Sequence, residues 1–217
     1  ARRGVRLGVL VIAADSLAGG TWQHRRWLAA AEAHRHLLDL ALAAVRAVRP
    51  QPVIAHLVDE GTDLTARTAR RRAVRAVVRR GDRLLMTRSR FGDYGFPGGG
   101  LEPGESPAEA LRRELAEEVG AQLVSTGELI GVAVQARRSI MPEWDTFVAR
   151  HEYYPCEISG ETRPVVLSGY EADLDLRPCW VEPAVALAAN RALDEAFLRE
   201  FPWALREAAV LEWLLDP

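Results

Sequence analysis

The chain has 217 residues, of which 48% are hydrophobic and 27% are charged, as in globular proteins that bury a full core without disulfides. Its formal net charge of −2 excludes the strongly basic character of many nucleic-acid and membrane-surface binders, so we expect neither as a partner. No apolar run is long enough to span a bilayer, and two cysteines fit a reducing compartment, so we expect a cytoplasmic protein.

The beginning of the chain is predicted to form a strand–helix–strand extension. Residues 5–13 are an apolar run typical of a buried strand, and the Ala-, Leu- and Arg-rich residues 21–48 have the pattern of a long helix. A second short strand is predicted at residues 52–58. A polar, glycine-bearing stretch follows, so we divide the chain into an extension, residues 1–66, and a main domain, residues 67–217. The extension could lengthen a sheet, form a dimer arm or be a separate lobe.

The main domain alternates strand and helix patterns. Residues 72–89 mix apolar residues with arginines around Gly81 and Asp82, which indicates a strand, a tight turn and a second strand. Later strands are predicted at residues 131–135, 146–158 and 176–181, and later helices at 182–190 and 193–215, the last one broken at Pro202. This order predicts a mixed α/β or α+β fold.

A helix between these strands has clear signals at both ends. Ser106 and Glu109 have the spacing of a capping box, and Pro107 stands at the first helical position. Gly120 can end the helix in a left-handed conformation. Its predicted apolar stripe consists of Ala110, Leu111, Leu115 and Val119.

The same helix carries three carboxylates on one face, because Glu117 and Glu118 follow Glu114 by three and four residues. Carboxylates this close repel one another unless a cation lies between them. Mg²⁺ prefers oxygen ligands, keeps several waters and is often shared with substrate phosphates. The preceding Gly98-Gly99-Gly100 can bring backbone groups close to such an ion and to a phosphate. The alternative is a solvated acidic face paired with arginines four residues away.

The spacing of these residues resembles the Nudix box. The fixed positions of that motif are matched by Gly99, Glu105, Arg113-Glu114-Leu115, Glu117-Glu118 and Gly120. Only Ala121 departs from it, where the family usually has a larger aliphatic residue. The resemblance implies an α/β/α sandwich with a mixed sheet and, by analogy, a homodimer. It also implies hydrolysis of a phosphoanhydride in a nucleoside diphosphate that is linked to another group.

The resemblance also implies roles for individual residues. The ligands that it implies for Mg²⁺, or for Mn²⁺, are the Gly99 carbonyl, Glu114, Glu117 and Glu118. One of these carboxylates, or a later acid, would act on the attacking water. Glu105 is similar to a supporting carboxylate and Arg113 to its positioning partner.

The later acid has one main candidate. Glu171 lies in a predicted loop before the strand at residues 176–181, although a surface glutamate is an equal alternative. Glu143 and Asp145 are weaker candidates for the same role.

Candidates for substrate binding flank the glycine loop. Arg88 and Arg90 stand just before it and are suited to hold phosphates, whereas Tyr94 and Phe96 are suited to contact a base. The arginines between residues 67 and 83 are expected on the solvent face of an edge strand instead.

The sequence therefore predicts an enzyme, a Mg²⁺-dependent nucleotide pyrophosphohydrolase. We expect a (d)NTP or an oxidised nucleotide as substrate, and a sugar nucleotide as the second choice. The proline and tyrosine that mark two other Nudix subgroups are missing, since Ala136, Arg137 and Arg138 occupy those places. The alternative is a sensor that binds a nucleotide metabolite without turnover, and release of phosphate or pyrophosphate would distinguish the two.

Overall fold

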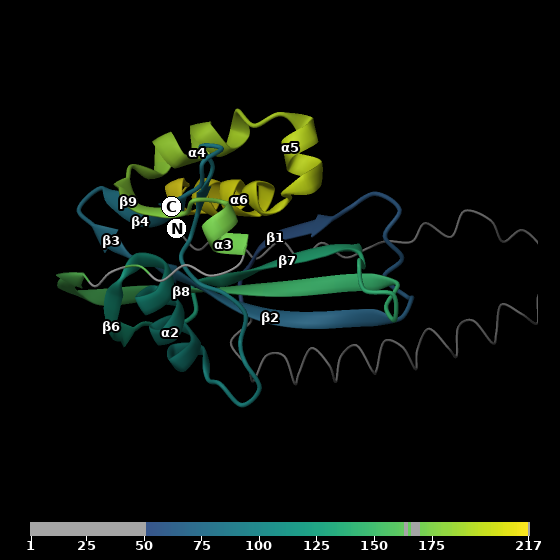
Figure 1. Cartoon of the computed structure of the whole chain (residues 1–217), viewed down its shortest axis with the longest axis horizontal. Coiled ribbons are helices and arrows are strands. Elements are labelled where there is room, and N and C mark those ends of the chain that lie inside the picture. Colours follow the sequence, from purple (N-terminus) through teal and green to yellow (C-terminus); the bar gives the residue numbers. More distant parts are fainter. Residues whose placement is uncertain (1–50, 163–164, 166–169, 217) are drawn as a thin grey trace, which may run out of the picture. The chain divides into compact units, whose positions relative to one another are not determined.

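The computed structural model describes residues 51–162, 165 and 170–216 (Figure 1). These residues belong to one compact unit, Gln51–Pro217. The strand and the long helix predicted before residue 50 lie outside the described residues. No described helix is both long and apolar enough to cross a membrane.

A five-stranded mixed sheet forms the centre of the unit. Its strands follow the order β1 (Val53–Val58), β7 (Gly131–Arg138), β8 (Thr146–Thr162) and β2 (Thr68–Val77). β1 runs parallel to β7, β7 antiparallel to β8, and β8 parallel to β2. β6 (Ala121–Thr126) pairs antiparallel with the far end of β8. The long β8 therefore joins the whole sheet.

A smaller sheet is built around β4 (Arg83–Arg88). β3 (Arg79–Arg80) and β5 (Tyr94–Gly95) pair with its two ends, and β9 (Arg177–Val181) pairs along its length. The turn between β3 and β4 contains Gly81 at φ 62°, a left-handed conformation that glycine adopts at little cost. The strand–turn–strand prediction for this region is confirmed.

One helix, α2 (Pro107–Val119), lies on one side of the sheets. The Ser106 hydroxyl accepts from the Glu109 N–H and the Glu109 carboxylate accepts from the Ser106 N–H, which confirms the capping box. Gly120 ends the helix at φ 66°. The predicted apolar stripe is buried in a core cluster with Val74, Ala76, Val78 and Leu85. This packing fixes the direction of the helix face that carries the carboxylates.

The C-terminal helices cover the opposite side (Figure 1). They are α4 (Pro183–Arg191), α5 (Glu195–Glu200) and α6 (Trp203–Leu215), and a one-turn helix, α3 (Tyr170–Asp173), precedes β9. Val210 and Leu211 of α6 are fully buried in a second core cluster that includes Ala133, Tyr153 and Met86. Helices on both sides of the sheets confirm the predicted α/β/α arrangement, and the break at Pro202 is also confirmed.

Two features differ from the sequence prediction. β1 pairs along β7, so the compact unit begins at Gln51 and the boundary expected between residues 66 and 67 falls inside it. β6 was not predicted, because only Ala121 of its six residues is fully buried and its apolar signal is weak. Pairing with β8 supplies the hydrogen bonds that its local sequence does not indicate.

A chain that begins at Thr68 should therefore unfold at a lower temperature than one that begins at Gln51. The side chains of Ile54 and Ala55 pack against the second core cluster, and Ile54 lies against Gly131. Removing β1 exposes this apolar surface, at a cost of about 2 kcal/mol or more. Thermal melting of the two truncated chains by circular dichroism checks this, and equal midpoints would contradict the assignment of β1 to the domain.

Candidate active site

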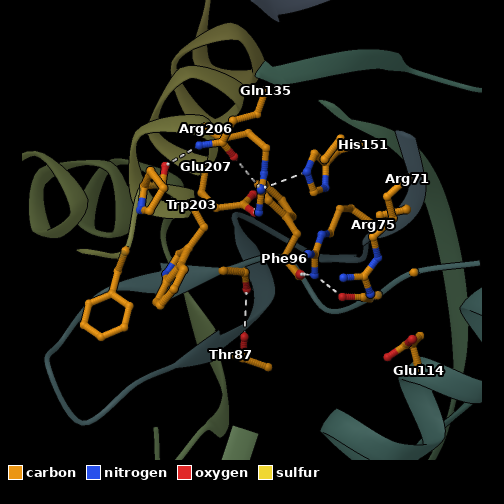
Figure 2. Close-up of a pocket in the computed structure, with 18 of the residues that line it drawn as sticks. Arg71, Arg75, Thr87, Phe96, Glu114, Gln135, His151, Trp203, Arg206 and Glu207 are labelled. Atoms are coloured by element: carbon orange, nitrogen blue, oxygen red, sulfur yellow. Dashed lines mark hydrogen bonds and ion pairs between the residues drawn. The ribbon is translucent and has the colours of Figure 1, made fainter. Parts of the chain in front are cut away.

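A cavity with a volume of about 510 Å³ lies beside the larger sheet (Figure 2). One end is formed by the loop Gly98–Gly100 and by α2, and the opposite side by α6 and the residues before it. The cavity therefore lies between the glycine loop, with the two buried carboxylates of α2 beside it, and the beginning of α6.

Strand alternation explains which side chains form the sheet wall of the cavity. Successive residues of a strand point to opposite faces, so every second residue of three paired strands reaches the cavity. The wall consists of Arg71, Ala73 and Arg75 from β2, Phe147, Ala149 and His151 from β8, and Gln135 and Arg137 from β7. The pairing register confirms the alignment, since Ala149 stands opposite both Arg71 and Gln135.

Two of the three predicted carboxylates line the cavity. Glu114 and Glu118 are both only 6% exposed, and the Gly98 N–H donates to Oε2 of Glu118 at 2.8 Å. Gly99 approaches so closely that a Cβ there would overlap the carboxylate of Glu114. Gly98 has φ 134°, and a Cβ on it would overlap the carbonyl of Val74. Both glycines are thus required by the packing of the loop against α2 and β2.

Glu117 differs from the other two carboxylates. Its side chain is 47% exposed, and it does not line the cavity. Its nearest described cation is Arg113, with Nη1 3.6 Å from its Oε2. The sequence places all three on one helical face, but the structure buries only two of them against the glycine loop.

Arg113 holds the loop and the helix together. Its Nε and Nη2 donate to the two carboxylate oxygens of Glu105, both at 3.0 Å. Its Nη1 donates to Oε1 of Glu114 at 2.7 Å, and Nη2 also donates to the carbonyl of Gly100 at 3.0 Å. Arg113 therefore makes the contact with Glu105 that the sequence predicts, and it fixes the position of Glu114 as well.

The electrostatics of the carboxylate end suit a bound cation. Burial raises the pKa of the Glu114 carboxyl above its usual range, and the guanidinium groups of Arg113 and Arg75 only partly offset this. Among the described residues, no three acidic, histidine or cysteine side chains converge closely enough to hold a metal alone. Two carboxylates fit an ion such as Mg²⁺ that keeps waters and shares phosphate oxygens. The Gly99 carbonyl accepts from the Val74 N–H at 2.9 Å and retains a second lone pair.

The substrate-binding candidates are only partly placed at the cavity. Phe96 lines it and is fully buried, with its ring edge-on to Tyr153. Tyr94 packs instead against the second core cluster, outside the cavity lining. Arg88 and Arg90 also lie outside the lining of the cavity, and both are exposed. The guanidinium of Arg88 lies over the ring of Tyr94, and that of Arg90 lies over the ring of Phe91. The structure therefore does not place these two arginines in the lining of the cavity.

The structure also shows where the candidates for the later catalytic acid lie relative to the cavity. Glu171 lies in α3, just before Leu174 and Leu176, which line the cavity. Its side chain is not among the described ones. Glu143 and Asp145 do not line the cavity, and Asp145 forms an exposed ion pair with Arg67. Only Glu171 stays a candidate.

Two arginines that the sequence predicts on a solvent-facing strand surface, Arg71 and Arg75, line the cavity. Arg71 and Arg75 lie on the edge strand β2, as expected, but on the face that forms the cavity wall. The alternation in residues 70–75 separates Arg71 and Arg75 from Arg70 and Arg72. That signal was present in the sequence, but only the pairing with β8 shows which of the two faces is covered.

A buried ion pair forms the far side of the cavity. Arg206 and Glu207 are almost fully buried, and Nη2 of Arg206 lies 2.5 Å from Oε1 of Glu207. The Tyr153 hydroxyl donates to Oε2 of Glu207 at 3.2 Å. Nη1 of Arg206 faces Nε2 of His151 at 3.0 Å and donates to Oε1 of Gln135 at 3.3 Å. These bonds satisfy the charges of Arg206 and Glu207, and they connect α6 to β7 and β8.

Aromatic rings line the rim beside this pair. Trp203 and Phe201 have ring centroids 4.7 Å apart, and both line the cavity. The indole N–H of Trp203 donates to Oδ2 of Asp93 at 2.8 Å. The helical pattern of residues 193–215 does not show that Trp203, at the start of α6, lines a cavity.

Comparison with known proteins fits this arrangement. The profile of the NUDIX domain matches residues 69–201, which is more than half of the chain and includes the glycine loop, α2 and the sheet wall. The chain belongs to the Nudix family. Within that family it is 35% identical over 86 residues to an RNA pyrophosphohydrolase of Sulfurovum, covering 38% of this chain and 48% of that protein. It is 57% identical over 35 residues to the nucleoside triphosphatase NudI of Escherichia coli, covering 16% of this chain and 25% of that protein.

These matches cover less than half of each curated relative of this Nudix chain. Among solved structures, a NUDIX hydrolase from Nitrosomonas europaea is 19% identical with a TM-score of 0.43, covering 64% of this chain and 88% of that one. An ADP compounds hydrolase is 25% identical with a TM-score of 0.40, covering 67% of this chain and 74% of that one.

The pH dependence of stability should reveal the buried imidazole of this Nudix site. Burial and the charges of Arg206, Arg75 and Arg71 hold the pKa of His151 well below its usual range. Below about pH 6.5 the unfolded chain binds a proton that folded His151 rejects, so stability falls by up to about 1.4 kcal/mol per pH unit. Urea unfolding from about pH 7 to about pH 5 should therefore show a steeper loss for the wild type than for His151→Gln. Parallel curves would contradict this environment for His151.

Proposed function

We propose that the protein is a divalent-metal-dependent hydrolase that cleaves a phosphoanhydride bond in a nucleoside diphosphate derivative. One observation carries this proposal: two buried carboxylates face a glycine loop at one end of a cavity whose wall is basic. An acidic end suits a metal ion, and a basic wall suits phosphate oxygens. The names of the RNA pyrophosphohydrolase and the nucleoside triphosphatase support the same bond type.

The residues of the acidic end have distinct parts in this proposal. Glu114 and Glu118 would hold the ion, with the Gly99 carbonyl as a further ligand and Glu117 joining from its exposed position. Such an ion neutralises phosphate charge and makes a coordinated water more acidic. Arg113 keeps Glu114 in place through the bonds that also bind Glu105 and the loop. Arg113 would raise the rate of hydrolysis by keeping the Glu114 carboxylate in its ligand position before the substrate binds.

The other residues orient the substrate and the water. Arg71 and Arg75 reach the cavity beside the glycine loop, where their guanidinium groups can contact anionic groups of the substrate. Glu171 is our candidate for the acid that takes a proton from the water, because α3 leads directly into residues that line the cavity. The rings of Phe201, Trp203 and Phe147 provide flat apolar surface for a base.

A (d)NTP or an oxidised nucleotide is the proposed substrate, within a cavity large enough for a nucleotide. Mg²⁺ is the proposed ion, with Mn²⁺ as its substitute. The cytoplasmic location and the homodimer stay predictions. Tight binding of nucleotides without any turnover would instead indicate a sensor.

Replacing one buried carboxylate should abolish most of the turnover. Glu114→Gln and Glu118→Gln keep the shape of each side chain but remove the charge that holds the ion, so kcat should fall about 10²-fold or more. Release of phosphate and pyrophosphate from a nucleotide panel with Mg²⁺ measures this. Glu157→Gln is the matched control, because Glu157 is exposed on β8 and bonds only to Ser125 among the described contacts. Equal rates in all three variants would refute the proposed site.

A further inference from the structure

Two side chains of the cavity, His151 and Arg75, have a buried polar atom without a hydrogen-bond partner among the described residues. His151 is 6% exposed, and its Nε2 lies 3.0 Å from Nη1 of Arg206. Arginine can only donate hydrogen bonds, so Nε2 of His151 must accept, and the hydrogen of the neutral ring is on Nδ1. Nδ1 has no hydrogen-bond partner among the described residues. His151 lines the cavity (Figure 2), and its Nδ1 is a buried N–H donor that no described residue uses.

Three side chains that line the cavity and could accept a hydrogen bond are already engaged. Glu207 accepts from Arg206 and Tyr153. Asp93 accepts from the Ser89 hydroxyl and from the Trp203 indole. Gln135 accepts from Arg206 through Oε1. A buried donor without an acceptor is costly, so this arrangement suits a ligand that brings its own acceptor oxygens.

Two arginines extend this donor surface along β2. Nη1 of Arg75 donates to the carbonyls of Gly98 and Phe96, but its buried Nε has no partner among the described residues. The guanidinium of Arg71 lies against Gly100, which has no side chain to displace it. In the part of the chain that the structure describes, no ion pair to Arg71 or Arg75 is found. Both contribute positive charge at His151, together with Arg206.

The donor surface formed by His151, Arg71 and Arg75 lies apart from the buried carboxylates. Figure 2 shows Arg75 and Arg71 between Glu114 on one side and His151 with Arg206 on the other. A diphosphate held by an ion at Glu114 and Glu118 would therefore not occupy the part of the wall that His151, Arg71 and Arg75 form.

We propose that His151, Arg71 and Arg75 bind a second anionic group of the substrate, a phosphate or a carboxylate that is separate from the scissile diphosphate. This proposal rests on the proposed function, which places the diphosphate at Glu114 and Glu118. The anion site would then define which class of nucleoside diphosphate derivative is bound. These three residues thus select nucleoside diphosphate derivatives that carry an additional negatively charged group. Neutral Nδ1–H and the two guanidinium groups together match an oxyanion with several acceptor oxygens.

Matched pairs of ligands test this with the full-length protein. The phosphate pair is ADP-ribose and its 2′-phosphate, and the carboxylate pair is UDP-glucose and UDP-glucuronate. Each pair keeps the diphosphate and differs by one distal anion. Calorimetric titration with Ca²⁺ in place of Mg²⁺, under conditions in which product analysis shows no turnover, measures affinity with an ion at the carboxylates, and the same ligands with Mg²⁺ then measure hydrolysis.

The member with the extra anion should bind about tenfold more tightly in at least one pair, as expected for hydrogen bonds to a charged group. That pair identifies the anion as phosphate or carboxylate. Arg71→Gln should reduce the preference to about twofold or less, whereas Arg70→Gln, one residue away on the opposite face of β2, should retain it. Arg71 is exposed, so its replacement does not threaten the core.

Two variants of His151 separate the donor from the packing. His151→Gln can still present an acceptor to Arg206 but loses the Nδ1 donor, and it should lose the preference. His151→Asn keeps an N–H near the position of Nδ1, and it should retain the preference at least in part. A melting temperature for each variant establishes that it is folded.

The outcomes distinguish the two proposals. Equal affinity for both members of both pairs, or a preference that persists in Arg71→Gln and His151→Gln, would overturn the anion site. Hydrolysis with Mg²⁺ but without preference upholds the proposed function and refutes the anion site. Preference without hydrolysis of any ligand upholds the anion site and refutes the proposed function.

Discussion

Close contact between a glycine loop and a helix governs the whole site. Gly98 and Gly99 bring the backbone so near to α2 and β2 that Glu114 and Glu118 are buried rather than hydrated. Two buried carboxylates would raise the free energy of the fold unless hydrogen bonds and cations compensate them. Arg113, the Gly98 N–H and Arg75 supply part of that compensation, and a divalent ion would supply more.

The sheet converts this local feature into a cavity with two different ends. β2 and β8 run parallel in one register, so the same alternation that buries Val74 against α2 directs Arg71 and Arg75 to the other face. On that face His151 is linked to α6 through Arg206, and Glu207 neutralises Arg206. Acidic groups therefore meet the glycine loop, basic and donor groups form the wall, and aromatic rings form the rim.

The sequence predicted local features well and long-range placement poorly. Capping by Ser106 and Glu109, the end at Gly120 and the apolar stripe depend on neighbours within one helix, so they could be read directly. The face of β2 that is covered and the contacts of Arg206 depend on strands and helices far away in the chain. The sequence therefore predicts Arg71 and Arg75 at the solvent face and does not indicate that Trp203 lines a cavity. The spacing of Arg88 to the loop likewise does not reveal that its side chain extends over Tyr94, outside the lining of the cavity.

Binding of Mn²⁺ measured by electron paramagnetic resonance tests most directly whether the buried carboxylates exist to hold a metal ion. The account predicts that the wild-type chain binds Mn²⁺, that Glu118→Gln binds it at least about tenfold more weakly, and that Glu157→Gln binds it as the wild type does. Unchanged Mn²⁺ affinity in Glu118→Gln, or no binding by the wild type, would contradict it.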